Sequence, residues 1–232
     1  MNAHLQPSGS AYFLDTVKPD VETHALAVIV DNEPGVLARV VGLFSGGGSA
    51  LLTLPAGAYT AVIEGAGGGT GIALAEAYEV NRDSAKIINL ATRGYADRSG
   101  REMHGGFYVQ GAAGSTKRVL IRVRGPSLAR APFNLSGVLD DPELELRNAA
   151  GQALVRNDDW STGAEGGASA ENDFKPFVVT HGEKAIFATG HAPANRREPC
   201  VMLDLPPGAY TVQIADSSGR SGVSLAEVYE VP

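Results

Sequence analysis

An internal repeat limits what this chain can fold into more than any other feature of its sequence. Residues 50–80 and residues 201–231 align without a gap and are identical at sixteen of thirty-one positions. A repeat this close indicates one structural unit that is used twice. About 120 residues separate the two copies, whereas only 49 residues precede the first copy. We therefore predict one complete unit and one truncated unit.

Alternation of apolar and polar residues indicates that the repeated unit is built of β-strands. In residues 119–124, β-branched residues on one face alternate with Arg122 and Arg124 on the other. Such alternation is typical of antiparallel strands with one buried and one solvated face. We predict further strands at residues 86–92, 106–111, 143–147, 153–157, 177–181, 185–189, 201–205, 210–214 and 223–231. Only residues 35–44 have the pattern of a short helix.

Turn residues separate these predicted strands. The strings LPAGAY and LPPGAY occur at the same place in the two copies, and their proline and glycine suit a tight turn between two strands. Many short strands, many turns and almost no helix predict an all-β, antiparallel, jelly-roll-like β-sandwich. We divide the chain into an N-terminal arm (1–24), a truncated β-sandwich unit (25–80) and a complete β-sandwich unit (81–232), with a hinge at 81–84.

Composition and charge exclude several classes of protein. The net charge is −7 and no basic stripe is present, which argues against a nucleic acid or an anionic membrane as partner. Cys200 is the only cysteine, so the chain has no internal disulfide. No apolar run reaches the 18 or so residues of a membrane span. The first residues also lack the basic and apolar regions of a secretory signal.

Much of the chain resembles a known kind of bacterial module. The strings IINLATRGYADRSGREMHGGFYVQG, KRVLIRVRGPSLA, DDPELELRNAAGQALVRNDDW and GVSLAEVYEV are similar to a repeat module of large secreted and cell-surface proteins. The end of the chain also resembles the bacterial pre-peptidase C-terminal domain, a jelly-roll-like β-sandwich appended to secreted enzymes and surface proteins. The resemblance covers most of residues 84–231 and part of residues 36–80. It implies an extracellular location and a structural, adhesive or targeting role.

An acidic turn follows one predicted strand. Asn157, Asp158 and Asp159 supply oxygen atoms of the kind that Ca²⁺ binds, and the ion takes six to eight of them. Further ligands could come from Asp140, Asp141, Glu171 and Asp173. The alternative is a polar turn in which these side chains cap their own backbone. We prefer the polar turn and predict no cofactor, with Ca²⁺ as the one ion that this turn could bind.

Each copy places a glutamate among the apolar residues of its last predicted strand. Counted by two, Glu76 and Glu227 share a face with tyrosine, valine and other apolar side chains. Burial of an ionised carboxylate is costly unless the group is paired. One interpretation is an ion pair with Arg122 or Arg124 that holds the last strand in register. The alternative is a β-bulge that turns each glutamate outward.

Three strings resemble parts of enzyme active sites but lack the required context. HGGF at residues 104–107 resembles an oxyanion-hole loop, and GPSLA at 125–129 resembles a nucleophile elbow without its second glycine. GGGTG at 67–71 has no lysine after it and opens no predicted helix, unlike a phosphate-binding loop. The five histidines show no metal-binding spacing. We therefore predict no catalytic residue and no zinc site.

The truncated unit suggests the function. A β-sandwich that lacks strands exposes unpaired backbone groups, and natural proteins rarely leave a long edge in that state. Leu26, Val28 and Val30 mark a candidate strand that could fill the gap within the chain or in a neighbouring copy. Head-to-tail exchange of such a strand would produce a filament or a ring. We predict a non-catalytic extracellular structural subunit that forms homo-oligomers or polymers; the alternative is a module that binds carbohydrate or a larger surface complex.

Overall fold

A computed structural model describes residues 38–40, 54, 56–63, 66–69, 74–77, 79, 86–97, 102–161 and 179–232. The chain forms two compact units, one of Leu14–Asn89 and one that contains Leu90–Pro232. We call them the first unit and the complete unit, and describe each by itself. The first unit contains the first copy of the repeat, and the complete unit contains the second copy.

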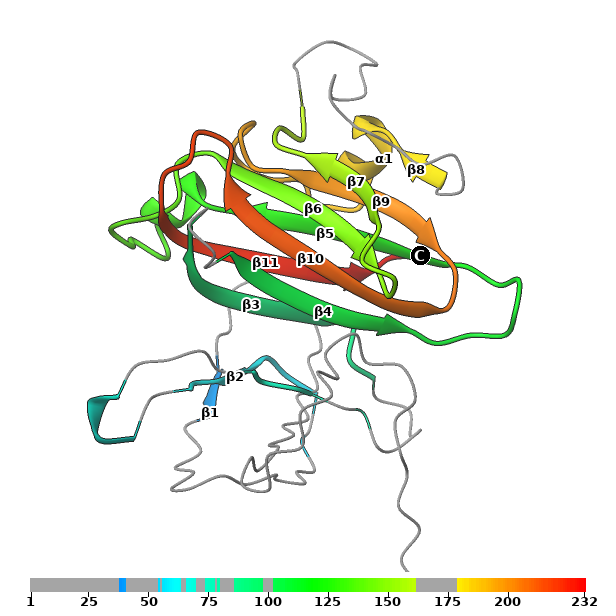
Figure 1. The fold of residues 1–232 in the computed structure, drawn as a ribbon, viewed down its shortest axis with the longest axis horizontal. Coiled ribbons are helices and arrows are strands. Elements are labelled where there is room, and N and C mark those ends of the chain that lie inside the picture. Colours follow the sequence, from blue (N-terminus) through cyan, green and yellow to red (C-terminus); the bar gives the residue numbers. More distant parts are fainter. Residues whose placement is uncertain are drawn as a thin grey trace, which may run out of the picture. The chain divides into compact units, whose positions relative to one another are not determined.

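The complete unit is a β-sandwich of two sheets, as predicted (Figure 1). The four-stranded sheet has the order β4 (Met103–Val109), β10 (Gly208–Asp216), β6 (Pro142–Asn148) and β7 (Ala153–Asn157). The five-stranded sheet has the order β3 (Asn89–Ala96), β11 (Gly222–Glu230), β5 (Lys117–Arg124), β9 (Cys200–Leu205) and β8 (Val179–His181). Most consecutive strands lie in different sheets, so the chain crosses repeatedly from one layer to the other.

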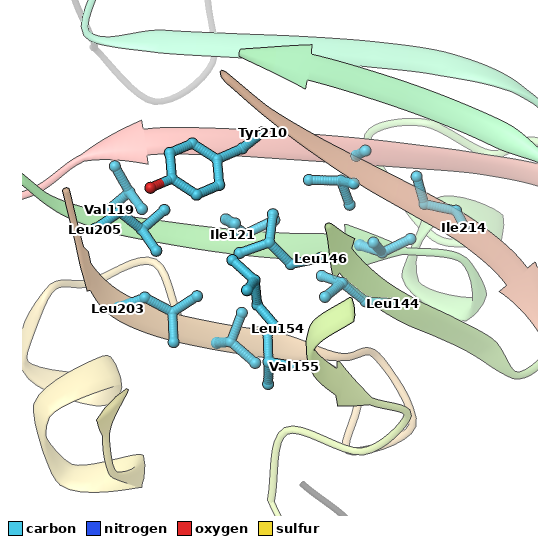
Figure 2. Close-up of a cluster of buried hydrophobic side chains, with 14 of the residues drawn as sticks. Val119, Ile121, Leu144, Leu146, Leu154, Val155, Leu203, Leu205, Tyr210 and Ile214 are labelled. Atoms are coloured by element: carbon cyan, nitrogen blue, oxygen red, sulfur yellow. The ribbon is translucent and has the colours of Figure 1, made fainter. Parts of the chain in front are cut away.

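The main hydrophobic core lies between the two sheets (Figure 2). Most of its residues come from alternate positions of the strands, which is what the apolar–polar alternation predicts. The largest fully buried members are Ile121, Leu139, Leu144, Leu146, Leu154, Leu203, Leu205 and Ile214. Burial of each such side chain stabilises the fold by about 1.5–3 kcal/mol.

In strand β11, the large apolar residues lie on the face that points away from the core between the sheets. Ala226 belongs to the core between the sheets, whereas Tyr229 and Val231 belong to a second buried cluster. Leu120 and Met202, which lie in register with Tyr229 across β5 and β9, are members of this second cluster. The alternating apolar residues at the end of β11 therefore lie on the outer side of the five-stranded sheet.

Helix α1 (Glu183–Ala188) contributes Ile186 to the second cluster. The prediction of a strand at 185–189 is wrong. The chain instead closes one helical segment with Gly190, whose φ is 75° and whose N–H donates to the carbonyl of Phe187. Helices often end at a glycine in the left-handed conformation, and acidic residues are favoured in the first turn, where Glu183 lies. Both are sequence signals for a helix, and the prediction from alternation overlooked them.

The described part of the first unit contains β1 (Ala38–Val40), β2 (Tyr59–Ala61) and the short 3₁₀ segment η1 (Ala66–Gly68). Strands β1 and β2 form a parallel pair. The prediction of a helix at 35–44 is therefore wrong at 38–40, because the ladder with β2 outweighs a weak local preference. Among the described residues, no helix is long and apolar enough to cross a membrane.

The two copies share one contact beside the turn that both sequences contain. In the complete unit, the Tyr210 hydroxyl donates to the carbonyl of Pro206 at 2.8 Å, and its ring curls back over Gly208. A Cβ atom on Gly208 would lie 3.8 Å from the Tyr210 oxygen, and one on Gly57 would lie 3.5 Å from the Tyr59 oxygen. Glycine and tyrosine two residues apart therefore pack against each other in both copies.

Candidate functional site

The structure brings two of the predicted residues together on the outer side of the five-stranded sheet. Arg122 of β5 and Glu227 of β11 are directly opposite each other in register. Arg122 Nε donates to Glu227 Oε2 at 2.6 Å, and Arg122 Nη2 donates to Glu227 Oε1 at 3.1 Å. Both side chains are nearly buried, with 13% and 10% of their area exposed. The register of β11 against β5 runs unbroken through this pair, so no bulge turns Glu227 outward.

Two more residues complete this cluster of Arg122, Glu227, Tyr229 and His191. The Tyr229 hydroxyl donates to Glu227 Oε1 at 2.7 Å, and Arg122 also donates to the carbonyl of His191 at 2.7 Å. The His191 ring stacks on the Tyr229 ring with centroids 4.1 Å apart. Burial lowers the pKa of His191 and the neighbouring Arg122 lowers it further, so the imidazole is neutral at neutral pH. The cluster is thus a closed ion pair that links β5, β11 and the segment after α1.

The other two residues of this prediction lie elsewhere. Arg124 donates to the hydroxyl of Ser127 at 3.1 Å and stacks over the ring of Phe133 at 4.7 Å. Glu76, the first-copy counterpart of Glu227, is half-buried in the first unit. Leu26, Val28 and Val30 lie outside the described residues, so the strand predicted there stays a prediction.

The side chain of Asn157 makes hydrogen bonds with two backbone groups. Its Oδ1 accepts the N–H of Cys200 at 2.9 Å, and its Nδ2 donates to the carbonyl of Asp159 at 2.8 Å. Burial raises the pKa of Asp159, and the charges of Asp158 and Asp141 raise it further. Within the part of the chain that the structure describes, no three His, Cys, Asp or Glu side chains are grouped as metal ligands. Glu171 and Asp173 lie outside that part, so the calcium site stays a prediction.

The turn between β10 and β11 engages the other two acidic candidates. Asp140 pairs with Arg220 at 2.8 Å, and Asp141 accepts the hydroxyl of Ser217 at 2.7 Å. Asp216, which is fully buried, accepts the N–H groups of Asp141, Ser218 and Arg220 at 2.9–3.2 Å. Desolvation would raise the pKa of Asp216, but these hydrogen bonds outweigh it and the pKa is lowered. These side chains act as caps for a tight turn.

The string at 125–129 forms a 3₁₀ turn, η2 (Pro126–Ala129), after β5. The buried carboxylate of Glu198 accepts the N–H groups of Gly125 and Ser127 at 3.0 and 2.8 Å. A Cβ atom on Gly125 would lie 2.2 Å from the carbonyl oxygen of Leu139, so only glycine fits there. Gly125, the glycine that makes this string resemble a nucleophile elbow, is therefore required by close packing. Sequence reasoning missed Glu198, since no local pattern links it to a turn seventy residues earlier.

A polar hollow of about 260 Å³ lies over the four-stranded sheet. Its lining consists of Glu102, Glu143, Glu145, Arg147, Arg156, Gln213 and Ala215. The buried carboxylate of Glu145 contacts the guanidinium groups of both Arg147 and Arg156. The hollow is therefore lined largely by charges that neutralise each other.

One apolar side chain of the first unit is exposed where its counterpart in the second copy is buried. Ile63 is 57% exposed, whereas Ile214, at the same position of the second copy, is fully buried. Val62 and Leu74 are 45% and 60% exposed. Isolated apolar residues on a surface are common, but an exposed residue whose counterpart is in a core indicates a missing cover. This comparison applies to Ile63 alone, because the counterparts of Val62 and Leu74 are Gln213 and Leu225, which are only partly buried.

Two comparisons with known proteins found no match for this chain. No protein-family model matches the sequence, and no curated protein matches it either. The resemblance to the pre-peptidase C-terminal domain thus remains an expectation. The function must be argued from the geometry above.

Proposed function

We propose that this chain is a non-catalytic extracellular structural subunit that assembles through its first unit. The observation that carries the proposal is the difference between Ile63 and Ile214. The side chain at this repeat position is exposed in the first unit and buried in the complete unit. Burial of Ile63, Val62 and Leu74 by another chain would supply a hydrophobic gain of roughly 25 cal/mol for each Å² removed from water.

The pairing of the equivalent strands supports the same proposal. In the complete unit, β10 lies between β4 and β6 and is antiparallel to both. In the first unit, the described partner of β2 is β1, and that pair is parallel. An antiparallel strand from a neighbouring copy would restore the surroundings that β10 has. The donor segment that we propose is the apolar stretch at 26–30.

Contacts of the candidate residues favour a structural role over a catalytic one. Glu227 accepts hydrogen bonds from both Arg122 and Tyr229, so its carboxylate is occupied. The hydroxyl of Ser127 accepts a hydrogen bond from Arg124, which is a cation and cannot act as a general base. We therefore assign the polar clusters of the complete unit to holding strands and turns.

The test is the mass of the full chain in solution, measured by light scattering after size exclusion. We expect oligomers larger than a dimer for the natural sequence and a shift toward smaller species for Ile63→Glu, because a charge at this position would oppose burial. The matched control is Phe187→Glu, since Phe187 is 72% exposed in the complete unit. A natural chain that stays monomeric, or an Ile63→Glu variant with unchanged mass, would refute the proposal.

A further inference from the structure

The two sheets of the complete unit end in four edge strands, β4 and β7 in one sheet and β3 and β8 in the other. An edge strand presents unpaired N–H and C=O groups to its surroundings. Natural proteins protect such edges with charged side chains, prolines, bulges or very short strands. The four edges can therefore be compared by the protection that each one carries.

Three of the edges are protected. Strand β8 has only three residues, Val179–His181. Strand β7 has five residues, its pairing with β6 is interrupted by a register shift, and it carries the exposed Arg156. Strand β3 carries the exposed Arg93 at its middle. Each of them would pair poorly with a strand from another molecule.

Strand β4 has none of these features. Its seven residues, Met103–Val109, include no proline, lysine, arginine, aspartate or glutamate. All seven pair with β10 in an unbroken register, so the strand is regular along its whole length. In the described part of the chain, no strand pairs with its other side. As far as the described residues go, this edge is therefore open for pairing.

We propose that β4 pairs antiparallel with β4 of a second copy of this chain, around a two-fold axis at Gly106. Directly opposite residues in an antiparallel pair lie on the same face of the sheet. Full overlap of the seven residues about a two-fold axis therefore places Gly106 opposite the partner's Gly106. The two four-stranded sheets become one continuous sheet, and the contact is the same on both subunits.

The side chains of β4 are complementary in this register. On the outer face, Tyr108, which is 63% exposed, lies opposite the partner's His104. On the inner face, Phe107 lies opposite the partner's Gly105, so an aromatic ring covers a glycine of the neighbouring strand. The partly buried Phe107 already stacks on Tyr210 of β10, at 5.4 Å between centroids. No like charges oppose each other anywhere along the pair.

A cysteine at the axis tests the proposal directly. In the full chain, Gly106→Cys would place two thiols on Cα atoms about 4.5–5.5 Å apart, which is within disulfide range. We expect mild oxidation to produce covalent dimers of this variant. The matched control is Arg93→Cys on the protected edge β3, which should form no covalent dimer. The natural Cys200 is buried and does not compete.

Two further variants test the register. His104→Cys mixed with Tyr108→Cys should form a covalent heterodimer, whereas neither variant should cross-link efficiently to itself. The double variant His104→Lys/Tyr108→Lys should weaken dimerisation at least tenfold through facing lysines. The double variant His104→Glu/Tyr108→Lys should restore it, because each glutamate then faces a lysine of the partner.

The proposal is overturned if Gly106→Cys cross-links no better than Arg93→Cys. It is also overturned if the two double variants dimerise equally, or if a strand of the same chain is found to cover β4. The proposed contact uses no residue of the first unit. Gly106→Cys combined with Ile63→Glu should therefore cross-link as well as Gly106→Cys alone, which separates a failure of this inference from a failure of the proposed function.

Discussion

Arg122 and Glu227 face each other across β5 and β11 and share two hydrogen bonds on the outer side of the five-stranded sheet. Arg122 is also held by the carbonyl of His191 and by the hydroxyl of Tyr229. The pair therefore connects two strands to the loop that follows α1. Because both charges are nearly buried, the loss of either partner leaves the other poorly compensated.

Replacement of Glu227 by glutamine should destabilise the complete unit by about 2–4 kcal/mol, since Arg122 would remain buried without its counter-charge. The change can be followed by urea unfolding with the fluorescence of Trp160, the only tryptophan, which packs against the second cluster. The matched control is Glu230→Gln, which removes the more exposed pair with Lys117. The control should cost less than about 1 kcal/mol. Equal effects of the two variants would contradict this account.

Asp216 makes the stability of the β10–β11 turn depend on pH. Its pKa is lowered in the folded chain, because the hydrogen bonds that it accepts outweigh desolvation. Its contribution is therefore fully present above the unfolded pKa of about 3.9 and is lost as the pH falls through the lower folded pKa. We expect Asp216→Asn to be less stable than the natural chain at pH 7, with a difference that shrinks below about pH 4. Unfolding midpoints measured from pH 7 to pH 2 test this, and a difference that is constant with pH would contradict it.

The repeat offers a matched pair of core variants. Ile214→Ala should cost about 2–5 kcal/mol, because it opens a cavity between the sheets. Ile63→Ala, at the same position of the first copy, should change the stability of the isolated chain by less than about 0.5 kcal/mol, because Ile63 is exposed. Calorimetry of both variants at a concentration where the chain is monomeric gives the comparison. Similar losses would show that Ile63 is covered within its own chain.

Gly222 begins β11 where another segment passes closely. A Cβ atom there would lie 2.6 Å from the backbone of Val138 and Leu139. This segment pairs with the strand through Val223, whose N–H donates to the carbonyl of Gly137 at 2.8 Å. We expect Gly222→Ala to cost about 1–3 kcal/mol, since the neighbouring backbone must move.

The control for this substitution is Gly182→Ala, because a Cβ atom on Gly182 would meet no atom within 4 Å. Chemical unfolding followed by Trp160 fluorescence compares the two variants. If Gly182→Ala proves as harmful as Gly222→Ala, the close approach at Gly222 is not the cause.

Cys200 should be chemically silent in the folded chain. Burial raises the pKa of its thiol, and this effect exceeds the opposing influence of the nearby Arg122. We expect almost no reaction with a thiol reagent at pH 8 until the complete unit unfolds. The rate of modification as a function of urea concentration measures this, and the exposed thiol of Arg93→Cys serves as the reactive reference. A fast reaction without denaturant would mean that the second cluster opens readily.

Local patterns predicted the strands of the complete unit well but failed where other segments decide the conformation. Residues 185–189 alternate as a strand would, yet they lie largely within α1 because Gly190 closes a helix and Ile186 finds a place in the second cluster. Residues 38–40 have no strong preference of their own and form β1 by pairing with β2. The face of β11 could not be predicted either, because apolar periodicity does not say which of two clusters it enters.

Period-two alternation and the repeat of thirty-one residues are properties of short stretches of sequence, so they were enough to predict an all-β chain with a repeated segment. Three relationships became visible only in the folded chain: Glu227 pairs with Arg122, Glu198 binds the N–H of Ser127 71 residues earlier, and Ile63 is exposed whereas Ile214 is buried. These relationships depend on which strands become neighbours. That choice arises from packing between segments far apart in the chain, to which no local pattern responds.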